Sequence, residues 1–282
     1  MLKYKQTVAN FLRRMHLLQL VDHLLCLLDI RRNWRDNKIF VEENPNFRLP
    51  PSGLSYDAYA HTNGRAYYRT GKEHAHYFAD LIKGQINKRE IKICEWGCGP
   101  GRVIRHIPQL FADRSVELYG FDYNPRSVEW CNANISNVTF CVNALAPPLP
   151  SESNAFDCLY CLSVFTHLSR EMHFQWMEEL SRVVKPDGLI ILTTHGDTSR
   201  ACLLSSEIRD YDEGNLVVRG GITEGKRCFV AFHPPSFVRN ELLGKLAVIS
   251  HFTESSQSLM QDVWLVRNSK NQIPNRQERP EK

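Results

Sequence analysis

The segment 91–102 constrains this chain more than any other, and it reads Ile-Lys-Ile-Cys-Glu-Trp-Gly-Cys-Gly-Pro-Gly-Arg. Its first half has the pattern of a buried strand that ends in Glu95. Gly97, Gly99 and Gly101 then form a turn that leads into a helix. Glycine lets the backbone adopt a positive φ and lets a ligand approach without a Cβ in the way. At the carboxyl edge of a parallel sheet, such a turn is typical of a nucleotide-type ligand site.

Glu95 narrows the choice of ligand. A carboxylate at this place repels a pyrophosphate but suits a cation, and S-adenosylmethionine carries both an ammonium and a sulfonium. The glycine spacing is Gly-x-Gly-x-Gly, whereas the dinucleotide fingerprint is Gly-x-Gly-x-x-Gly. Both observations favour S-adenosylmethionine over a nicotinamide dinucleotide.

A second strand, predicted over residues 116–122, also ends in an acid. Asp122 can accept hydrogen bonds from both ribose hydroxyls of a nucleoside, and Tyr123 can lie on the adenine face. The alternative is that Asp122 caps the helix that begins near Pro125.

A third strand, predicted over residues 138–142, is followed by Asn143 and Ala144. The Asn143 amide can read the exocyclic amine of adenine, and the Ala144 backbone N–H can reach a ring nitrogen. The alternative for Asn143 is that it only starts a turn. Glu95, Asp122 and Asn143 lie at the ends of successive predicted strands in this order, and together they predict an adenosine-containing cofactor.

Over about residues 70–267 these motifs resemble those of the class I S-adenosylmethionine-dependent methyltransferases. Residues 155–168 are similar to the fourth strand and its loop in bacterial small-molecule methyltransferases. Residues 178–192 are similar to the next helix, a Pro-Asp-Gly turn and the fifth strand. The resemblance implies a three-layer, Rossmann-like α/β fold. Its seven-stranded mixed sheet has an antiparallel last strand, built by a hairpin near residues 246–267.

The resemblance also implies roles for individual residues. Glu95 and the three glycines match the family's first motif, and Asp122 matches its ribose-binding acid. Asn143 matches the adenine-edge position, where Asp is more usual. Ser163 lies where the backbone passes the methionine moiety.

Two residues before the domain could complete the cofactor site. Tyr68 and Arg69 can close over the cofactor from the N-terminal side, with Arg69 on its carboxylate. The alternative is that these side chains only pack along the protein surface, with their polar ends in solvent.

Three histidines follow the ends of predicted strands: His167 follows the fourth, His195 the fifth and His233 an extra strand over residues 228–232. Substrates of such sheets bind beyond the carboxyl ends of the strands. A hydroxyl acceptor loses a proton when it is methylated, and the pKa of histidine suits a general base. We therefore predict His167, His195 and His233 as catalytic candidates. A structural role is the alternative for each, and His167 could cap the helix that starts near Ser169.

The acceptor is predicted to be a small molecule with a hydroxyl, such as a sugar or a secondary metabolite. The loop after the fourth strand lacks the Asn/Asp-Pro-Pro-Tyr/Phe sequence that holds a nitrogen in base and glutamine methylation. We find no paired-carboxylate metal site and predict no metal. Two other functions remain open: a non-catalytic partner or scaffold protein that binds an S-adenosyl ligand, and a nicotinamide-dependent oxidoreductase.

Charge argues against a nucleic-acid substrate. Of the formal net charge of +4, residues 1–38 alone carry +5, with eight Lys or Arg against three Asp. The rest of the chain is close to neutral and shows no basic groove. Residues 17–30 are the most apolar stretch, and they are too short to cross a membrane. We expect a cytoplasmic location.

We expect three parts along the chain. Residues 1–70 form an N-terminal helical extension that caps the substrate side, and residues 71–267 form the methyltransferase domain. Residues 195–232 are an insertion after the fifth strand that could serve as a lid. The polar residues 268–282 are predicted to be a disordered tail.

Residues 5–33 are predicted to form one amphipathic helix, whose apolar stripe contains Leu17, Val21, Leu24 and Leu28. Such a helix can dock on its own domain or on a second copy in a homodimer. The other interpretation is a peripheral membrane contact, in which the arginines of the helix lie near anionic headgroups.

Overall fold

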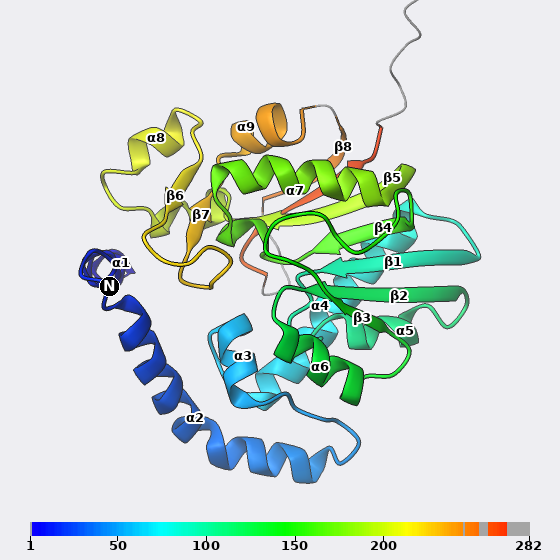
Figure 1. The fold of residues 1–282 in the computed structure, drawn as a ribbon, viewed down its shortest axis with the longest axis horizontal. Coiled ribbons are helices and arrows are strands. Elements are labelled where there is room, and N and C mark those ends of the chain that lie inside the picture. Colours follow the sequence, from blue (N-terminus) through cyan, green and yellow to red (C-terminus); the bar gives the residue numbers. More distant parts are fainter. Residues whose placement is uncertain (1, 245, 254–258, 270–282) are drawn as a thin grey trace, which may run out of the picture.

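The computed structural model describes residues 2–244, 246–253 and 259–269. Seven strands form one mixed sheet in the order β3-β2-β1-β4-β5-β9-β8 (Figure 1). Their bounds are β1 Glu90–Trp96, β2 Ser115–Asp122, β3 Thr139–Val142, β4 Phe156–Cys161, β5 Val184–Thr194, β8 Ala247–Phe252 and β9 Asp262–Arg267. Strands β1 to β5 are parallel, and β9 is antiparallel to both β5 and β8. The predicted sheet, with its antiparallel last strand, is confirmed.

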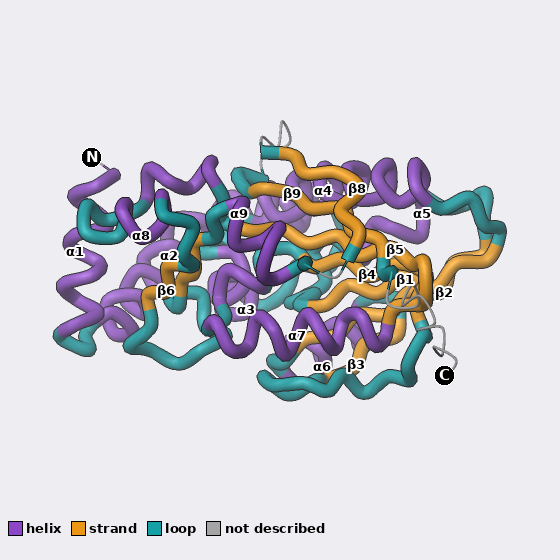
Figure 2. The backbone as a smooth tube through the Cα atoms, turned by 90° about the horizontal axis from the view of Figure 1, so that it is seen from above, coloured by secondary structure: helices purple, strands orange, loops and turns teal. Residues whose placement is uncertain are grey.

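Helices cover both faces of this sheet, as the view in Figure 2 shows. Their bounds are α1 Leu2–Arg14, α2 Leu18–Glu43, α3 Ser52–Tyr59, α4 Gly64–Gln85, α5 Ile107–Leu110, α6 Pro125–Asn134, α7 Arg170–Val183, α8 Ile208–Asp212 and α9 Pro235–Phe237. α4, α5 and α6 pack on one face, whereas α7 and α9 pack on the other. Side chains alternate between the two faces along each strand, so Ile93 packs toward α4 and Cys94 toward α7.

The helix starts follow from capping residues. Asn63, Asn124 and Ser169 each accept a hydrogen bond from a backbone N–H in the first turn of α4, α6 and α7. These caps satisfy amides that have no partner inside the helix. Two alternatives from the sequence are thereby wrong, because α6 is capped by Asn124 rather than Asp122, and α7 by Ser169 rather than His167.

The N-terminal extension differs from the single helix expected over residues 5–33. It divides into α1 and α2 at His16, whose φ is +56°. Between α2 and α4 the chain forms the short helix α3. Pro50 and Pro51 directly precede this helix, since proline suits the residues that lead into a helix. Residues 270–282 of the expected tail lie outside the described residues.

The insertion forms a small sheet of its own. β6 Val217–Arg219 pairs antiparallel with β7 Val230–Phe232, apart from the main sheet. In Figure 1 this hairpin, α8, α1 and α3 lie beyond the carboxyl ends of the parallel strands.

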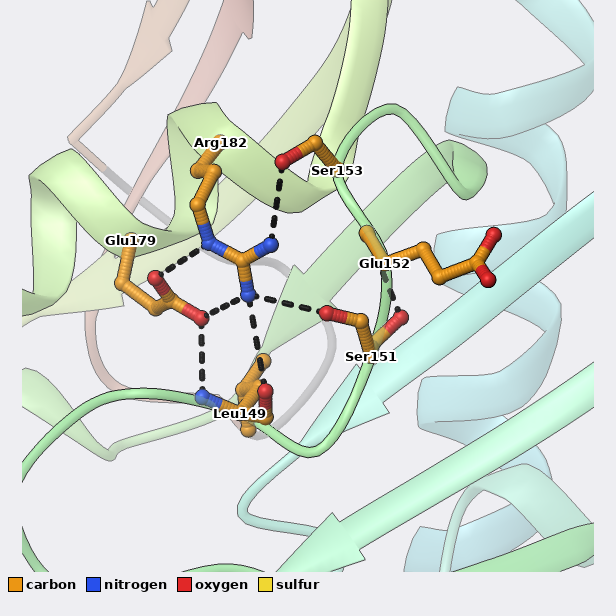
Figure 3. A network of polar contacts seen from close by, with 6 residues as sticks. All are labelled: Leu149, Ser151, Glu152, Ser153, Glu179 and Arg182. Carbon is orange, nitrogen blue, oxygen red and sulfur yellow. Dashed lines mark hydrogen bonds and ion pairs between the residues drawn. The ribbon is translucent and has the colours of Figure 1, made fainter.

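A polar network fixes the connection from β3 to β4 against α7 (Figure 3). Glu179 accepts from the backbone N–H of Leu149 at 2.8 Å and from the Arg182 Nε at 2.7 Å. Arg182 also donates to the Ser151 carbonyl at 3.0 Å and to the Ser153 hydroxyl at 3.1 Å. The connection begins with Asn143, so this network steadies one edge of the site described below.

Replacing Arg182 should therefore destabilise the fold. Arg182→Ala leaves the buried Glu179 carboxylate without its cation, and we expect the free energy of unfolding to fall by about 2 kcal/mol. Urea denaturation with an unchanged m-value measures this difference. Arg209→Ala, which breaks the exposed pair with Glu213, is the matched control and should leave stability nearly unchanged. Equal stability of the two variants would contradict the role given to the network.

Candidate active site

A cavity of about 550 Å³ lies at the carboxyl ends of the parallel strands. Its walls come from β1 and β2, from the loops after β3, β4 and β5, and from α3, α4 and the insertion. Nine of the residues predicted from the sequence line it: Glu95, Gly97, Gly99, Asp122, Tyr123, Asn143, Ser163, His167 and His195. This is the place where substrates of open α/β sheets bind.

The glycine turn has the conformation that its sequence predicts. Gly97, Gly99 and Gly101 all have positive φ, between +51° and +75°. A Cβ on Gly97 would lie 2.2 Å from the Val164 side chain, and one on Gly101 would lie 2.4 Å from that of Ile135. Gly97 thus permits contact with the loop after β4. Gly101 serves packing and is not part of the cavity wall.

Glu95 is buried at the foot of the turn. Its Oε2 accepts hydrogen bonds from the Ile104 N–H and from the Tyr160 hydroxyl, both at 3.0 Å. Burial raises the pKa of Glu95 to about 8, which these two hydrogen bonds only partly offset. The side chain is therefore mostly uncharged at neutral pH until a cation lies beside it.

Asp122 joins the end of β2 to the glycine turn. Its two carboxylate oxygens accept from the N–H groups of Gly99 at 2.7 Å and Asn124 at 2.8 Å. Burial raises its pKa to about 6. Each oxygen retains acceptor capacity toward the cavity, since a carboxylate oxygen has two lone pairs.

The adenine side of the predicted site contains one unsatisfied acceptor. The Asn143 Nδ2 donates to the Ala144 carbonyl at 2.6 Å, whereas its buried Oδ1 has no partner among the described residues. A buried unpaired amide oxygen is costly unless a ligand donates to it. Ala144 itself is exposed and does not line the cavity, while Tyr123 lines it and donates to the Gly225 carbonyl at 3.2 Å.

The structure does not bring Tyr68 and Arg69 into the cavity. Tyr68 packs edge-on against Phe47, at 4.8 Å between ring centroids. Arg69 is exposed and pairs with Glu73 at 2.8 Å. α4 presents Thr70 to the cavity instead, and a helix turns by 100° per residue, so its neighbours point elsewhere.

Arg102 lies where Arg69 was expected to act, and the sequence analysis missed it. It lines the cavity, is 9% exposed and donates to the Thr70 hydroxyl at 2.8 Å. Its guanidinium carbon lies 4.5 Å from the centre of the Tyr59 ring. The Arg102 Nε and the Tyr59 hydroxyl are both buried without a partner among the described residues. The sequence signal that could have identified Arg102 was its position directly after Gly101, the last glycine of the turn.

Two covers close the cavity. α3 lies over the glycine turn, where a Cβ on Gly99 would be 3.1 Å from the Tyr59 hydroxyl. On the other side the cover is the insertion. Its residue Gly225 contacts the cavity wall, because the Gly225 N–H donates to the His167 carbonyl at 3.0 Å. Such covers exclude water from a site.

The N-terminal helices hold the insertion in place. The Arg13 guanidinium on α1 donates to three carbonyls of the insertion, those of Arg219, Gly220 and Cys228. Asp22 on α2 forms an ion pair with Arg227, which lines the cavity. Segments about two hundred residues apart therefore meet at this site.

His167 and His195 are held by neighbouring carbonyls next to β7. The His167 Nδ1 lies 2.8 Å from the Phe229 oxygen, and the His195 Nδ1 lies 3.2 Å from the Ala231 oxygen. A carbonyl can only accept, so both rings carry hydrogen at Nδ1. Burial lowers the pKa of His167, and it lowers the pKa of His195 to about 4. Both rings are thus neutral at pH 7, with a lone pair on Nε2.

His233 lies outside the cavity. Its ring is fully buried, and its Nε2 is 2.7 Å from the Nε2 of His173 on α7. Its backbone N–H donates to the His195 carbonyl at 2.8 Å. β7 belongs to the separate hairpin, so the residue after it does not share the edge of the main sheet. Of the three predicted histidines, two meet at the cavity. Among the described residues no cluster of three His, Cys, Asp or Glu could hold a metal.

Comparison with known proteins agrees with this fold. Residues 94–192 match the family model of a methyltransferase domain. A malonyl-[acyl-carrier protein] O-methyltransferase of Bacillus cereus is 24% identical over 60% of this chain and 59% of its own length. The tRNA N(3)-methylcytidine methyltransferase trm140 of Schizosaccharomyces pombe is 26% identical over 50% and 47%. The chain thus spans about half the length of these relatives.

A solved structure gives the same fold. An S-adenosylmethionine-dependent methyltransferase from Methanosarcina mazei superposes with a TM-score of 0.50 at 16% identity, over 66% of this chain and 96% of that one. The chain therefore contains a class I S-adenosylmethionine-dependent methyltransferase domain. This places it apart from the nicotinamide-dependent oxidoreductases that the sequence left open.

Arg102 and Arg69 can be compared directly. Arg102→Gln should weaken binding of S-adenosylhomocysteine about 10- to 100-fold, because it removes a charged donor from a buried wall. Arg69→Gln, on the same side but exposed, should leave the dissociation constant unchanged. Isothermal titration calorimetry measures both. A loss of affinity in the Arg69 variant alone would restore the role predicted from the sequence.

Proposed function

We propose that this protein transfers a methyl group from S-adenosylmethionine to a hydroxyl of a small-molecule acceptor, with His167 as general base. The observation that carries the proposal is the pair of neutral imidazoles in the cavity wall, each with its Nδ1 committed to a backbone carbonyl. Of the two, His167 has the shorter Nδ1 contact, and a strong hydrogen bond at one ring nitrogen raises the basicity of the other.

The cavity residues fit the cofactor. The unpaired Arg102 Nε and Tyr59 hydroxyl would donate to its carboxylate, and Glu95 would ionise beside its ammonium. Asp122 would accept from the ribose hydroxyls, and the unpaired Asn143 Oδ1 would accept from the adenine amine. Three buried polar atoms that lack partners would thereby gain them, which supports an adenosine ligand with an amino-acid end.

When bound, S-adenosylmethionine supplies a methyl group attached to a sulfonium sulfur. The acceptor oxygen attacks the methyl carbon from the side opposite the sulfur, which leaves as part of S-adenosylhomocysteine. The acceptor O–H becomes more acidic as its oxygen bonds to carbon, and His167 Nε2 takes that proton. The covers formed by α3 and the insertion keep water away from the reacting atoms and hold the acceptor in position. His195 lies next to His167 and stays neutral, because a protonated neighbour lowers its pKa further.

A small acceptor is favoured over a nucleic acid. Both covers contact the cavity wall through Tyr59 and Gly225, so a large polymer would have to displace them. One relative methylates tRNA, as its name states, but it aligns with only half of this chain. The name of the other specifies O-methylation. A cytoplasmic location agrees with such an acceptor.

The proposal is tested first by ligand binding and then by turnover. S-adenosylhomocysteine should raise the melting temperature by several degrees, as expected for a ligand well above its dissociation constant, and NAD should not. Methyl transfer from labelled cofactor is then followed with phenols, sugars, acyl-carrier thioesters and tRNA. Product with a hydroxyl compound supports the proposal and product with tRNA alone contradicts it. Cofactor binding with no acceptor favours the non-catalytic alternative.

Cofactor binding should release a proton through Glu95. Its pKa of about 8 means that the side chain is mostly protonated at pH 7, and an adjacent ammonium lowers that pKa. Affinity should therefore rise as pH increases toward 8. Calorimetry in buffers with different ionisation enthalpies should detect close to one proton released at pH 7. Glu95→Gln should abolish the release, and a release that persists in this variant would assign it elsewhere.

His167→Ala should lower kcat by about two to four orders of magnitude and leave the dissociation constant of S-adenosylhomocysteine unchanged. In the wild type saturated with cofactor, kcat/KM for the acceptor should be level above pH 7 and fall in acid, because the base must be unprotonated and its pKa lies below the usual 6.5. His76→Ala, an exposed histidine on α4, is the control. Near-normal kcat in the His167 variant would remove it from the mechanism, and a loss confined to His195→Ala would move the role there.

A further inference from the structure

α2 contacts the rest of the molecule through its polar side. The Asp29 carboxylate accepts from the N–H of Thr62 at 2.6 Å and from its hydroxyl at 2.8 Å. The Asn37 Oδ1 accepts from the Gly64 N–H at 2.7 Å. With Asn33 and Asp22, these residues recur every four or seven positions, which places them on one side of a helix. That side faces the body of the protein.

The opposite side of α2 is apolar and exposed. We call it the leucine face, and it comprises Leu17, Leu20, Leu24, Leu25, Leu27, Leu28 and Trp34. Leu20, Leu28 and Trp34 are 58%, 64% and 61% exposed. A helix on a globular domain normally buries its apolar stripe and exposes its polar one, so this arrangement is inverted. A contiguous exposed apolar patch marks a surface that binds something.

Cations flank the leucine face at both ends. Arg14 precedes it, and Arg31, Arg32, Arg35 and Lys38 overlap its far end; all are exposed. None of them pairs with an acidic side chain among the described residues. Asp22 and Asp29 are occupied on the inner side of the helix. Asp36 is the one exposed acid between residues 14 and 38, so five cations against one carboxylate leave the surface around the leucines positive.

We propose that the leucine face docks on an anionic lipid surface, with α2 lying in the plane of the membrane. Leucines would enter the boundary of the acyl chains, Trp34 would lie at headgroup depth and the arginines would meet the phosphates. No described helix is long and apolar enough to cross a bilayer. The inference does not depend on the methyltransferase activity.

A second copy of the chain in parallel orientation fits this face less well. Arg31 and Arg35 of one copy would each face the same arginine of the other, and repulsion of this kind selects against a partner.

Flotation with vesicles tests the proposal. The full-length protein should float with phosphatidylcholine vesicles that contain about 30% phosphatidylglycerol, and at least about tenfold less with phosphatidylcholine alone. Raising the salt from about 0.05 to 0.5 M should weaken the binding, because exposed charges are screened. Changing Leu20, Leu24 and Leu28 together to Gln should reduce binding by about 100-fold or more.

The charge contribution has a matched control. Arg31→Gln, Arg32→Gln and Arg35→Gln combined should reduce binding to anionic vesicles by about 100-fold, at roughly fivefold for each arginine. Arg89→Gln, Arg126→Gln and Arg209→Gln combined remove the same charge from exposed positions elsewhere and should change binding little. Circular dichroism and binding of S-adenosylhomocysteine show that each variant is folded.

Three outcomes would overturn the inference: wild-type protein that does not float with anionic vesicles, leucine variants that float as well as wild type, or a control triple variant that loses binding equally. Light scattering adds a fourth. A wild-type dimer that the leucine variant dissociates, without any flotation, would show that the leucine face joins two copies of the chain.

Discussion

The site depends on how the end of β2 holds the turn after β1. Three consecutive amides of that turn are used there: the N–H groups of Gly97 and Cys98 donate to the Phe121 carbonyl, and that of Gly99 donates to Asp122. A turn with three positive-φ residues would otherwise sample many conformations. Because β1 and β2 are parallel neighbours, with Trp96 beside Phe121, the geometry of the sheet fixes the bend. The same Asp122 carboxylate shapes the turn and retains acceptor capacity toward the cavity, where we propose that it binds the ribose.

The second requirement is that distant segments close over that turn. Histidine tautomers in the cavity are set by the carbonyls of Phe229, just before β7, and Ala231 within it, which lie two residues apart and so point to the same side. β7 belongs to the insertion, and the insertion is held by Arg13 and Asp22 of the N-terminal helices. The protonation state of the proposed base, His167, therefore depends on Arg13 and Asp22, which lie about 150 positions earlier in the chain. A change in α1 or α2 that moves the insertion would therefore also move the carbonyls that hold the two histidine rings.

Much of the sheet and half of the site could be predicted, for one physical reason. Parallel strands end at a common edge, so Glu95, Asp122 and Asn143 had to meet there once each strand was recognised. The same reasoning failed for His233, since β7 lies in a separate sheet. Tyr68 and Arg69 were misplaced because they were assigned to the extension before residue 71, whereas α4 starts at Gly64 and fixes where each side chain points. Arg102 was missed although it directly follows the glycine turn, because its buried, unpaired Nε becomes apparent only when Tyr59 is folded over it.

The leucine stripe of α2 was recognised, but its direction was not. Periodicity locates an apolar side without saying what covers it. In this protein the polar side is matched instead, residue by residue, to groups that begin α4: Thr62, Asn63 and Gly64. Those hydrogen bonds form only with the leucines outward, since rotating the helix would turn Asp29 and Asn37 toward solvent. The buried N–H groups of Thr62 and Gly64 would then lie without acceptors against leucine side chains. The exposed apolar side is thus enforced by specific polar contacts on the inner side, and it is not the result of a loosely packed helix. An apolar surface that specific contacts keep exposed is expected to bind a partner. The positive charge around the leucine face favours an anionic partner, as we propose for the lipid surface.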